Sequence, residues 1–595
     1  MTKRTIATSV CFCALTASSL LQANDAYLVR NLVSDIPDLA DFTDPHLQGA
    51  WGISESPGSP FWISDAGSGF STLYTTSGSV VPLVVAIAPS KASGASAAGS
   101  PTGTVWNSSN GGFQVNGKSA PFLFATFDGT IQAWSPAIDG AHSQVMVDNS
   151  ASGAEYFGLA MASDPLSGNT FLYAANFHSG QIEVFDENYK PIPMPGGFRD
   201  PAIPSNYAPF NIQALKGNLY VAYAQQNSSQ TFSNSGPGLG YVDVFAPNGV
   251  MVQQLAAKGP LNAPWGLAIA PVGFGDFAGD VLVGNFGDGT INAFNAKTGA
   301  FVAQLNDSIG APINIPSLWA LQAGNGKSGG EAAAIYFTAG IPGPDNGNHG
   351  LFGRLHAAPQ LTVAGLVNAG NAQGGIAPNT WVAIMGWNVA ETTRSMNSGD
   401  VVSGALATEI DGVSVTINGE AAYVDYVSPT QVNVLTPTDL ATGSVNLQLD
   451  NHGLVSNTVA ITVQALAPAF FPSMTTPKYI MATHSDGTAV GPTAPAPNAA
   501  SPARPGETIW LYGTGFGPTN PATPNGMVIT TPLPLATMPT VMIGGATASV
   551  TSANLQMAGT YQIAVVVPSS AKAGDVSVTA TAGGVTSPAG LIPVQ

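Results

Sequence analysis

The chain has 595 residues, of which 8% are charged, and its formal net charge is −18 at pH 7. Such an acidic chain repels phosphate backbones, which excludes nucleic acid as an expected partner. The 69 glycines and 46 prolines suit a protein with many turns between short strands, and the length suits several domains.

Residues 1–23 have the pattern of a signal peptide. Basic residues at 3–4 precede an apolar run over 6–21 that is too short for a comfortable membrane span, and no later stretch approaches a transmembrane segment. Both cysteines, Cys11 and Cys13, lie inside this run. We therefore expect a secreted protein without disulfides, located in the periplasm, at the cell surface or in the extracellular medium.

A strand-rich phrase recurs through residues 24–358. The central residues of its five clear copies are 106, 54, 54 and 54 positions apart, and 106 is twice 53, so a degenerate sixth copy is expected near Val105. Two more β-type runs follow each copy, which predicts a six-bladed β-propeller. The periodic tryptophans are interpreted as packing residues. The clear copies are Trp51-Gly52-Ile53, Phe157-Gly158-Leu159, Asn211-Ile212-Gln213, Trp265-Gly266-Leu267 and Trp319-Ala320-Leu321.

The sixth repeat lacks a run for a fourth strand, because its third run leads directly into Pro359. The segment 27–33 has the length and pattern to take that place. A first strand that completes the last blade would close the ring and remove exposed sheet edges.

After the propeller, two modules share an internal pattern. The corresponding glycines Gly386 and Gly513 are 127 positions apart, which is the size of an immunoglobulin-like sandwich. The predicted fold is all-β, with the propeller followed by two immunoglobulin-like β-sandwiches at 359–467 and 468–595. The second contains a Pro/Ala-rich segment near 490–506 that reads as an extended loop or linker.

The propeller region resembles a family of uncharacterised secreted bacterial proteins through PWGLAIAP (264–271), VLVGNFGDGTINAF (281–294) and YFTAGIPGPDNGNHGLFGRL (336–355). This resemblance implies a six-bladed propeller related to the NHL and lactonase group, and it implies no activity. The phrases SPTQVNVLTP (428–437) and GETIWLYGTGFG (506–517) are similar to C-terminal domains of secreted acidobacterial proteins and to the IPT/TIG branch of immunoglobulin-like folds. They imply accessory modules that bind, space or anchor.

Polar residues at the ends of the second runs are the candidate site. Propellers usually present functional groups at the mouth of the central channel. Asp65, Asn176 and Asn285 come from alternate blades and could offer oxygen ligands to Ca²⁺. The alternative is that these groups end strands and satisfy neighbouring backbone amides. The five candidate binding residues are Asp65, Thr126, Asn176, Tyr223 and Asn285.

Other chemistry has weaker support in the sequence. His46, His178 and His349 lie in loops without the short spacing of a chelating pair. Glycoside hydrolysis needs two carboxylates that converge in space, and no pair stands out. The carboxylate candidates are Asp44, Glu55, Asp65, Glu155 and Asp186.

Three classes of function follow from these observations. The favoured class is a secreted or cell-surface binding protein, whose propeller recognises a glycan or a protein and whose sandwiches act as spacers or anchors. The alternatives are a calcium-dependent, lactonase-like hydrolase with its site at the channel mouth, and a structural protein of a surface layer or matrix. Enzyme activity is not the favoured prediction, and no cofactor other than Ca²⁺ is suggested.

Overall fold

The computed structural model describes residues 26–595 except 95–97, 166, 344–346, 374 and 494–499. The predicted signal peptide and the centre of the Pro/Ala-rich segment lie outside the described residues. Apart from two 3-10 turns, η1 (Ser150–Ser152) and η2 (Gly275–Phe277), the regular structure consists of strands, which confirms the all-β prediction. No helix in the described ranges is long and apolar enough to cross a membrane.

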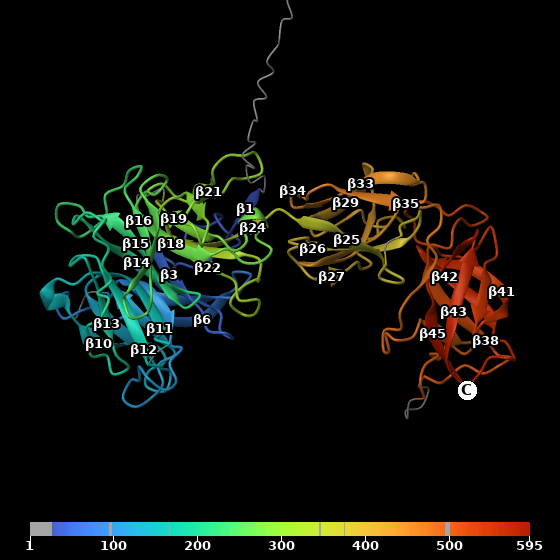
Figure 1. The fold of residues 1–595 in the computed structure, drawn as a ribbon, viewed down its shortest axis with the longest axis horizontal. Coiled ribbons are helices and arrows are strands. Elements are labelled where there is room, and N and C mark those ends of the chain that lie inside the picture. Colours follow the sequence, from blue (N-terminus) through green and yellow to red (C-terminus); the bar gives the residue numbers. More distant parts are fainter. Residues whose placement is uncertain (1–25, 95–97, 166, 344–346, 374, 494–499) are drawn as a thin grey trace, which may run out of the picture.

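Six sheets follow one another from residue 27 to 357 and form a propeller (Figure 1). The inner strands β3, β7, β11, β14, β18 and β22 contact one another in that order, and β22 contacts β3, so the ring is closed. The first three sheets are β3 (Ala50–Ser54), β4 (Phe61–Asp65), β5 (Phe70–Tyr74) and β6 (Val80–Ala86); β7 (Pro101–Trp106), β8 (Phe122–Thr126), β9 (Thr130–Trp134) and β10 (Gln144–Asp148); and β11 (Tyr156–Ser163), β12 (Thr170–Asn176) and β13 (Gln181–Phe185).

The remaining sheets are β14 (Tyr207–Leu215), β15 (Asn218–Gln225), β16 (Tyr241–Phe245) and β17 (Met251–Ala257); β18 (Pro264–Ile269), β19 (Val281–Asn285), β20 (Ile291–Phe294) and β21 (Phe301–Gln304); and β22 (Leu318–Ala323), β23 (Ile335–Ala339), β24 (Leu351–Ala357), β1 (Tyr27–Ser34) and β2 (Phe42–Thr43). Strand β7 contains Val105, as expected for the degenerate copy of the repeat. Strand β1 pairs antiparallel with β24, so the prediction that the amino-terminal segment closes the ring is confirmed.

In several blades a glycine at or near the centre of the repeated phrase lets neighbouring inner strands meet. A Cβ atom on Gly103 would lie 2.4 Å from the backbone nitrogen of Leu159, and one on Gly52 would lie 2.3 Å from the carbonyl oxygen of Thr102. Side chains beside these crossings also bridge the blades, since Thr102 Oγ1 donates to the carbonyl of Tyr156 at 2.5 Å. The period of the repeat therefore marks the contact points of the ring.

The carboxyl-terminal third consists of two β modules, each with its own apolar core. The first core draws on residues 361–463, and the second on residues 470–594. In the first module, one sheet contains β25 (Gln360–Asn368), β26 (Trp381–Trp387), β32 (Gln431–Leu435), β31 (Tyr423–Ser428) and β27 (Arg394–Ser395), and the other contains β28 (Glu409–Ile410), β29 (Val413–Ile417), β30 (Glu420–Ala421), β33 (Gly443–Asn451), β34 (Leu454–Val455) and β35 (Val459–Val463).

In the second module, the long strand β41 (Ala546–Met557) joins two groups of strands. Its first residues pair with β40 (Thr540–Ile543), and the remainder pairs with β42 (Thr560–Val566). The immunoglobulin-like assignment of both modules stays a prediction. The other strands are β36 (Ala469–Phe470), β37 (Ala482–His484), β38 (Thr508–Thr514), β39 (Leu533–Pro534), β43 (Gly574–Ala582), β44 (Val585–Thr586) and β45 (Gly590–Val594).

Ion pairs join the first module to the closing sheet of the propeller, and one of them is buried. Arg30 on β1 lies directly opposite Arg354 on β24, and like charges in such a pair repel. Glu391, which follows β26, accepts hydrogen bonds from Arg30 Nη1 and, at 2.9 Å, from Arg354 Nη2. The side chains of Glu391 and Arg354 are 4% and 5% exposed. One carboxylate of the module thus neutralises a cation on each of the two strands that close the ring.

Two further contacts belong to this joint. Asn388 Nδ2 donates to the carbonyl oxygen of Gly273 in the propeller at 2.9 Å, and the ring of Trp387 lies against the same glycine. His356 is buried in the closing sheet, and burial, together with the positive charges of Arg354 and Arg30, lowers its pKa to about 3. This imidazole is therefore neutral and adds no third positive charge to the joint.

We expect Gly103→Ala to lower the free energy of unfolding by about 1–3 kcal/mol, the usual cost of overpacking. The added methyl group would meet backbone atoms of the next inner strand, which have no rotamer to change. Gly140→Ala is the matched control, because a Cβ atom there has nothing within 4 Å. Urea unfolding of the two variants measures the difference, and equal midpoints would contradict tight contact in the ring.

Glu391→Gln should destabilise the protein by about 1.5–3 kcal/mol, because it removes the charge from the hydrogen bonds that join Glu391 to both arginines. Arg354 keeps its pair with Glu331, and Arg30 keeps its pair with Asp41. Lys478→Gln, which removes the exposed pair with Asp575, should cost less than about 1 kcal/mol. Thermal unfolding of both variants gives the comparison. The interpretation fails if the two substitutions have the same effect.

Candidate functional site

Different kinds of side chain lie at the two ends of the propeller channel. At the end where the second strands finish, aromatic rings fill the centre: Trp51 stacks on Trp319 with ring centroids 3.7 Å apart, and Trp319 stacks on Phe286 at 4.2 Å. The predicted packing role of the repeated tryptophans is confirmed, since Trp51, Trp265 and Trp319 are 6%, 3% and 4% exposed. Further rings packed at this centre are Phe127, Phe157, Phe177, Phe210 and Phe232.

The five residues predicted from the strand ends all lie buried near this aromatic end. Asn176 Oδ1 accepts from two backbone N–H groups, and its Nδ2 donates to Glu183 Oε1 at 2.6 Å. Asn285 Oδ1 accepts from the backbone of Asn262 at 3.0 Å, and its Nδ2 donates to the carbonyl of Pro260. These bonds support the structural alternative for both asparagines. Thr126 and Tyr223 lie at the equivalent ends of β8 and β15.

Asp65 differs from these residues because neither of its oxygens has a well-formed hydrogen bond within the described part of the chain. Burial raises the pKa of this carboxyl well above its usual range; nearby Thr72 opposes that rise, and the charges of Asp44 and Asp35 add to it. Among the described residues, no three His, Cys, Asp or Glu side chains gather into a group that could hold a metal ion. A Ca²⁺ site built on Asp65, Asn176 and Asn285 stays a prediction.

The remaining candidates do not form one site. His46 Nδ1 is 2.9 Å from Asp44 Oδ1, and His349 Nδ1 is 2.8 Å from Asp35 Oδ2, so each of these histidines is paired with its own aspartate. Asp186 accepts two backbone N–H groups in a turn. Burial raises the pKa of Glu155 to about 7. His178 lies next to the aromatic end, directly after Phe177.

The opposite end of the channel is open and polar. A cavity of about 300 Å³ lies where the inner strands of five sheets, β3, β7, β11, β14 and β22, finish. Such a volume is at the lower limit for small-molecule sites. Its lining is Ile53, Ser54, Glu55, Thr104, Val105, Trp106, Ser108, Leu159, Ala160, Met161, Gln213, Ala214 and Gln322.

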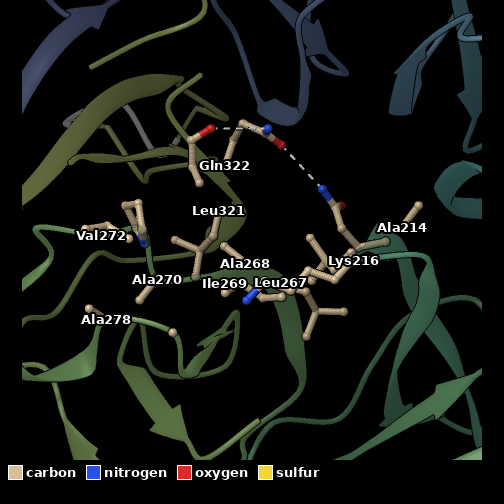
Figure 2. A pocket seen from close by; sticks show the side chains of 15 residues that line it. Ala214, Lys216, Leu267, Ala268, Ile269, Ala270, Val272, Ala278, Leu321 and Gln322 are labelled. Carbon is tan, nitrogen blue, oxygen red and sulfur yellow. Dashed lines mark hydrogen bonds between the residues drawn. The ribbon is translucent and has the colours of Figure 1, made fainter. Parts of the chain in front are cut away.

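Three polar side chains form a linked row in this cavity. Gln322 Nε2 donates to Glu55 Oε1 at 3.0 Å, and Gln213 Nε2 donates to Gln322 Oε1 at 3.4 Å. Figure 2 shows Gln322 above the aliphatic side chains of the neighbouring strand; Glu55 is not among the residues drawn. The second oxygen of Glu55, Oε2, is buried and has no partner among the described atoms. This row therefore retains hydrogen-bonding capacity toward the cavity.

The environment of Glu55 favours its neutral form. Burial raises the pKa of this carboxyl to about 8, although the hydrogen bond from Gln322 favours the charged form. Near pH 7 the row thus consists of a carboxylic acid and two carboxamides, each of which can donate and accept hydrogen bonds. Such a site suits an uncharged polar ligand.

The repeated phrase itself carries a signal for this site. One, two and three positions after the centre of the repeated phrase, most copies have aliphatic or other apolar residues. Gln213, Gln322 and Glu55 are the strongly polar exceptions at these three positions. Glu55 was among the carboxylate candidates, and the two glutamines were missed.

We expect the stability difference between Glu55→Gln and the unaltered protein to grow as the pH rises from 4.5 to about 8. Because the folded pKa lies above the unfolded value of 4.5, the contribution of the neutral acid is complete below pH 4.5 and is lost as the pH rises through 8. Glutamine keeps the neutral form at every pH. Melting temperatures between pH 4.5 and 9 measure the difference, which should stay constant for Glu409→Gln at an exposed position.

A constant difference for Glu55→Gln over this range would contradict a neutral Glu55. Because both proteins contain the same other titrating groups, including Glu155, their contributions cancel in the comparison.

Known structures with a similar fold are distant. The aldose sugar dehydrogenase of Streptomyces coelicolor in its PQQ-bound form is 13% identical, with a TM-score of 0.33, and the match covers 56% of this chain and 99% of the enzyme. A streptogramin B lyase structure is also 13% identical, with a TM-score of 0.27, and the match covers 56% of this chain and 98% of that one.

Sequence relatives are closer. No protein-family model matches the chain. Uncharacterized protein R648 of Acanthamoeba polyphaga mimivirus is 31% identical over 306 residues, which cover 50% of this chain and 74% of the viral protein. Uncharacterized protein L690 of the same virus is 30% identical over 337 residues, which cover 55% of this chain and 85% of the viral protein. The chain therefore belongs to the family of these two uncharacterized mimivirus proteins.

Proposed function

We propose that this protein is a secreted or cell-surface binding protein, whose propeller recognises a glycan or a protein at the open end of its channel. The observation that carries this proposal is the row Glu55, Gln322 and Gln213 in the 300 Å³ cavity. Convergent polar groups in one cavity are typical of a site that orients a ligand.

Binding is better supported than hydrolysis because of the composition of the cavity. Its lining contains one carboxyl group, that of Glu55, and no histidine. Glycoside hydrolysis ordinarily needs two carboxyl groups on opposite sides of the bond, and activation of a serine needs an adjacent base that is itself oriented. The lactonase-like alternative places Asp65, Asn176 and Asn285 at its centre, and the amide groups of the two asparagines are already hydrogen-bonded.

The charge of the protein further limits the classes of ligand that fit the site. The formal net charge of −18 disfavours anionic ligands, and a neutral Glu55 removes the one negative charge from the cavity lining. The ligand is therefore an uncharged glycan or an uncharged protein segment. The secreted location is part of the proposal, because it rests on residues 1–23.

Gln322→Ala should weaken ligand binding by about tenfold, since one hydrogen bond contributes about 1–1.5 kcal/mol. The measurement is titration of the full chain against arrayed neutral oligosaccharides and uncharged peptides, followed by affinities for the best binder. Gln181→Ala, on the exposed edge of β13, is the control and should leave affinity unchanged. If no arrayed compound binds, or if Gln322→Ala binds as well as the unaltered protein, the proposed site is wrong.

A further inference from the structure

A groove leads outward from the polar cavity. It has a volume of about 460 Å³ and shares Gln213, Ala214 and Gln322 with the channel cavity. It passes over the ends of β14, β18 and β22 and along the loop after β18. A ligand anchored at Glu55 can therefore extend into the groove without leaving the surface of the propeller.

The walls of this groove are aliphatic. Figure 2 shows Leu267, Ile269 and Leu321 below Gln322, with Val272 and Lys216 on opposite sides. The remaining lining consists of alanine, glycine, proline, leucine and glutamine residues, and it contains no aromatic ring. Sugar rings usually stack on aromatic faces, whereas aliphatic walls suit the side chains of leucine, valine and alanine. The groove therefore favours a polypeptide over a glycan.

The outer end of the groove meets the first β module. Val272 lines the groove and is 71% exposed. The next residue, Gly273, touches the ring of Trp387, and its carbonyl accepts the hydrogen bond from Asn388. Trp387 is itself 43% exposed. An exposed indole of the module thus stands beside the exposed end of the groove.

The position of this indole is fixed by the joint already described. Glu391 lies four residues after Trp387 and is held between Arg30 and Arg354. Because the side chains of Glu391 and Arg354 are nearly fully buried, the module is held against the propeller by more than a flexible connection. A single docked arrangement is what a binding surface shared by two domains requires.

We propose that the row at Glu55, the aliphatic groove and Trp387 form one continuous site for an extended, uncharged polypeptide segment rich in aliphatic side chains. This inference rests on the proposed function and names its ligand. The carboxamides of Gln213 and Gln322 match the donors and acceptors of peptide bonds, the groove takes the aliphatic side chains, and Trp387 covers the far end. The first β module is then part of the recognition site as well as a spacer.

The test uses calorimetric titration of the full chain with acetylated and amidated, unlabelled heptapeptides and tripeptides built from leucine, valine, alanine, serine and glycine, with neutral oligosaccharides as a separate arm. Heptapeptides should bind better than tripeptides. Trp387→Ala should weaken heptapeptide binding by about tenfold, as for an aromatic anchor at an interface, and should leave tripeptide binding unchanged. Trp387→Phe should retain most of the affinity, and Met542→Ala, at an exposed site of the second module, should have no effect.

The outcomes separate the two proposals. If heptapeptides bind and Gln322→Ala weakens them while Trp387→Ala does not, the channel site stands and the shared site is overturned. If oligosaccharides bind and no peptide does, the peptide inference is overturned and the binding function survives. If no compound in either arm binds, both proposals fail. Melting curves of the Trp387 variants ensure that lost binding is not lost folding.

Discussion

The close contact of six inner strands around one axis is the constraint on which the rest of the structure depends. Neighbouring strands approach until the backbone of one fills the space of a side chain on the other, as at Gly52 and Gly103. Side chains that precede these close contacts along each inner strand are directed to one end of the channel, where Trp51 and Trp319 stack. Side chains after each crossing reach the other end. One packing requirement thus produces a filled aromatic end and an open polar end.

Closure of this ring also depends on a residue outside it. Strand β1 completes the last sheet and places Arg30 opposite Arg354, and like charges in such a pair repel. Asp41 and Glu331 each pair with one of these arginines, and Glu391 of the first module pairs with both. Removing an ion pair of this kind in one step is costly because the remaining charge stays desolvated. Ring closure and module docking are therefore energetically coupled, although the two parts have separate apolar cores.

The propeller could be predicted from the sequence because the signals for its strands are local and repeated. Strand runs, the spacing of about 54 residues and the free place for the first strand all follow from nearby residues. The site was not predictable in the same way. Glu55 and Gln322 are 267 positions apart and meet only because the ring closes. Asn176 and Asn285, in contrast, had the expected position at strand ends, but local backbone groups use their amides. The type of residue at a strand end does not reveal whether its side-chain amide is already hydrogen-bonded within the protein.

The neutrality of the open end follows from the same geometry. A carboxyl group at the mouth of a narrow channel loses much of its hydration, and the protein offers Glu55 an amide from Gln322 but no cation within the lining of the cavity. At the joint, by contrast, the side chain of Glu391 is 4% exposed and lies between two arginines. The fold therefore gives these two glutamates opposite surroundings: Glu391 pairs with cations and joins the first module to the propeller, whereas Glu55 meets an amide, becomes neutral and keeps one oxygen without a partner among the described atoms.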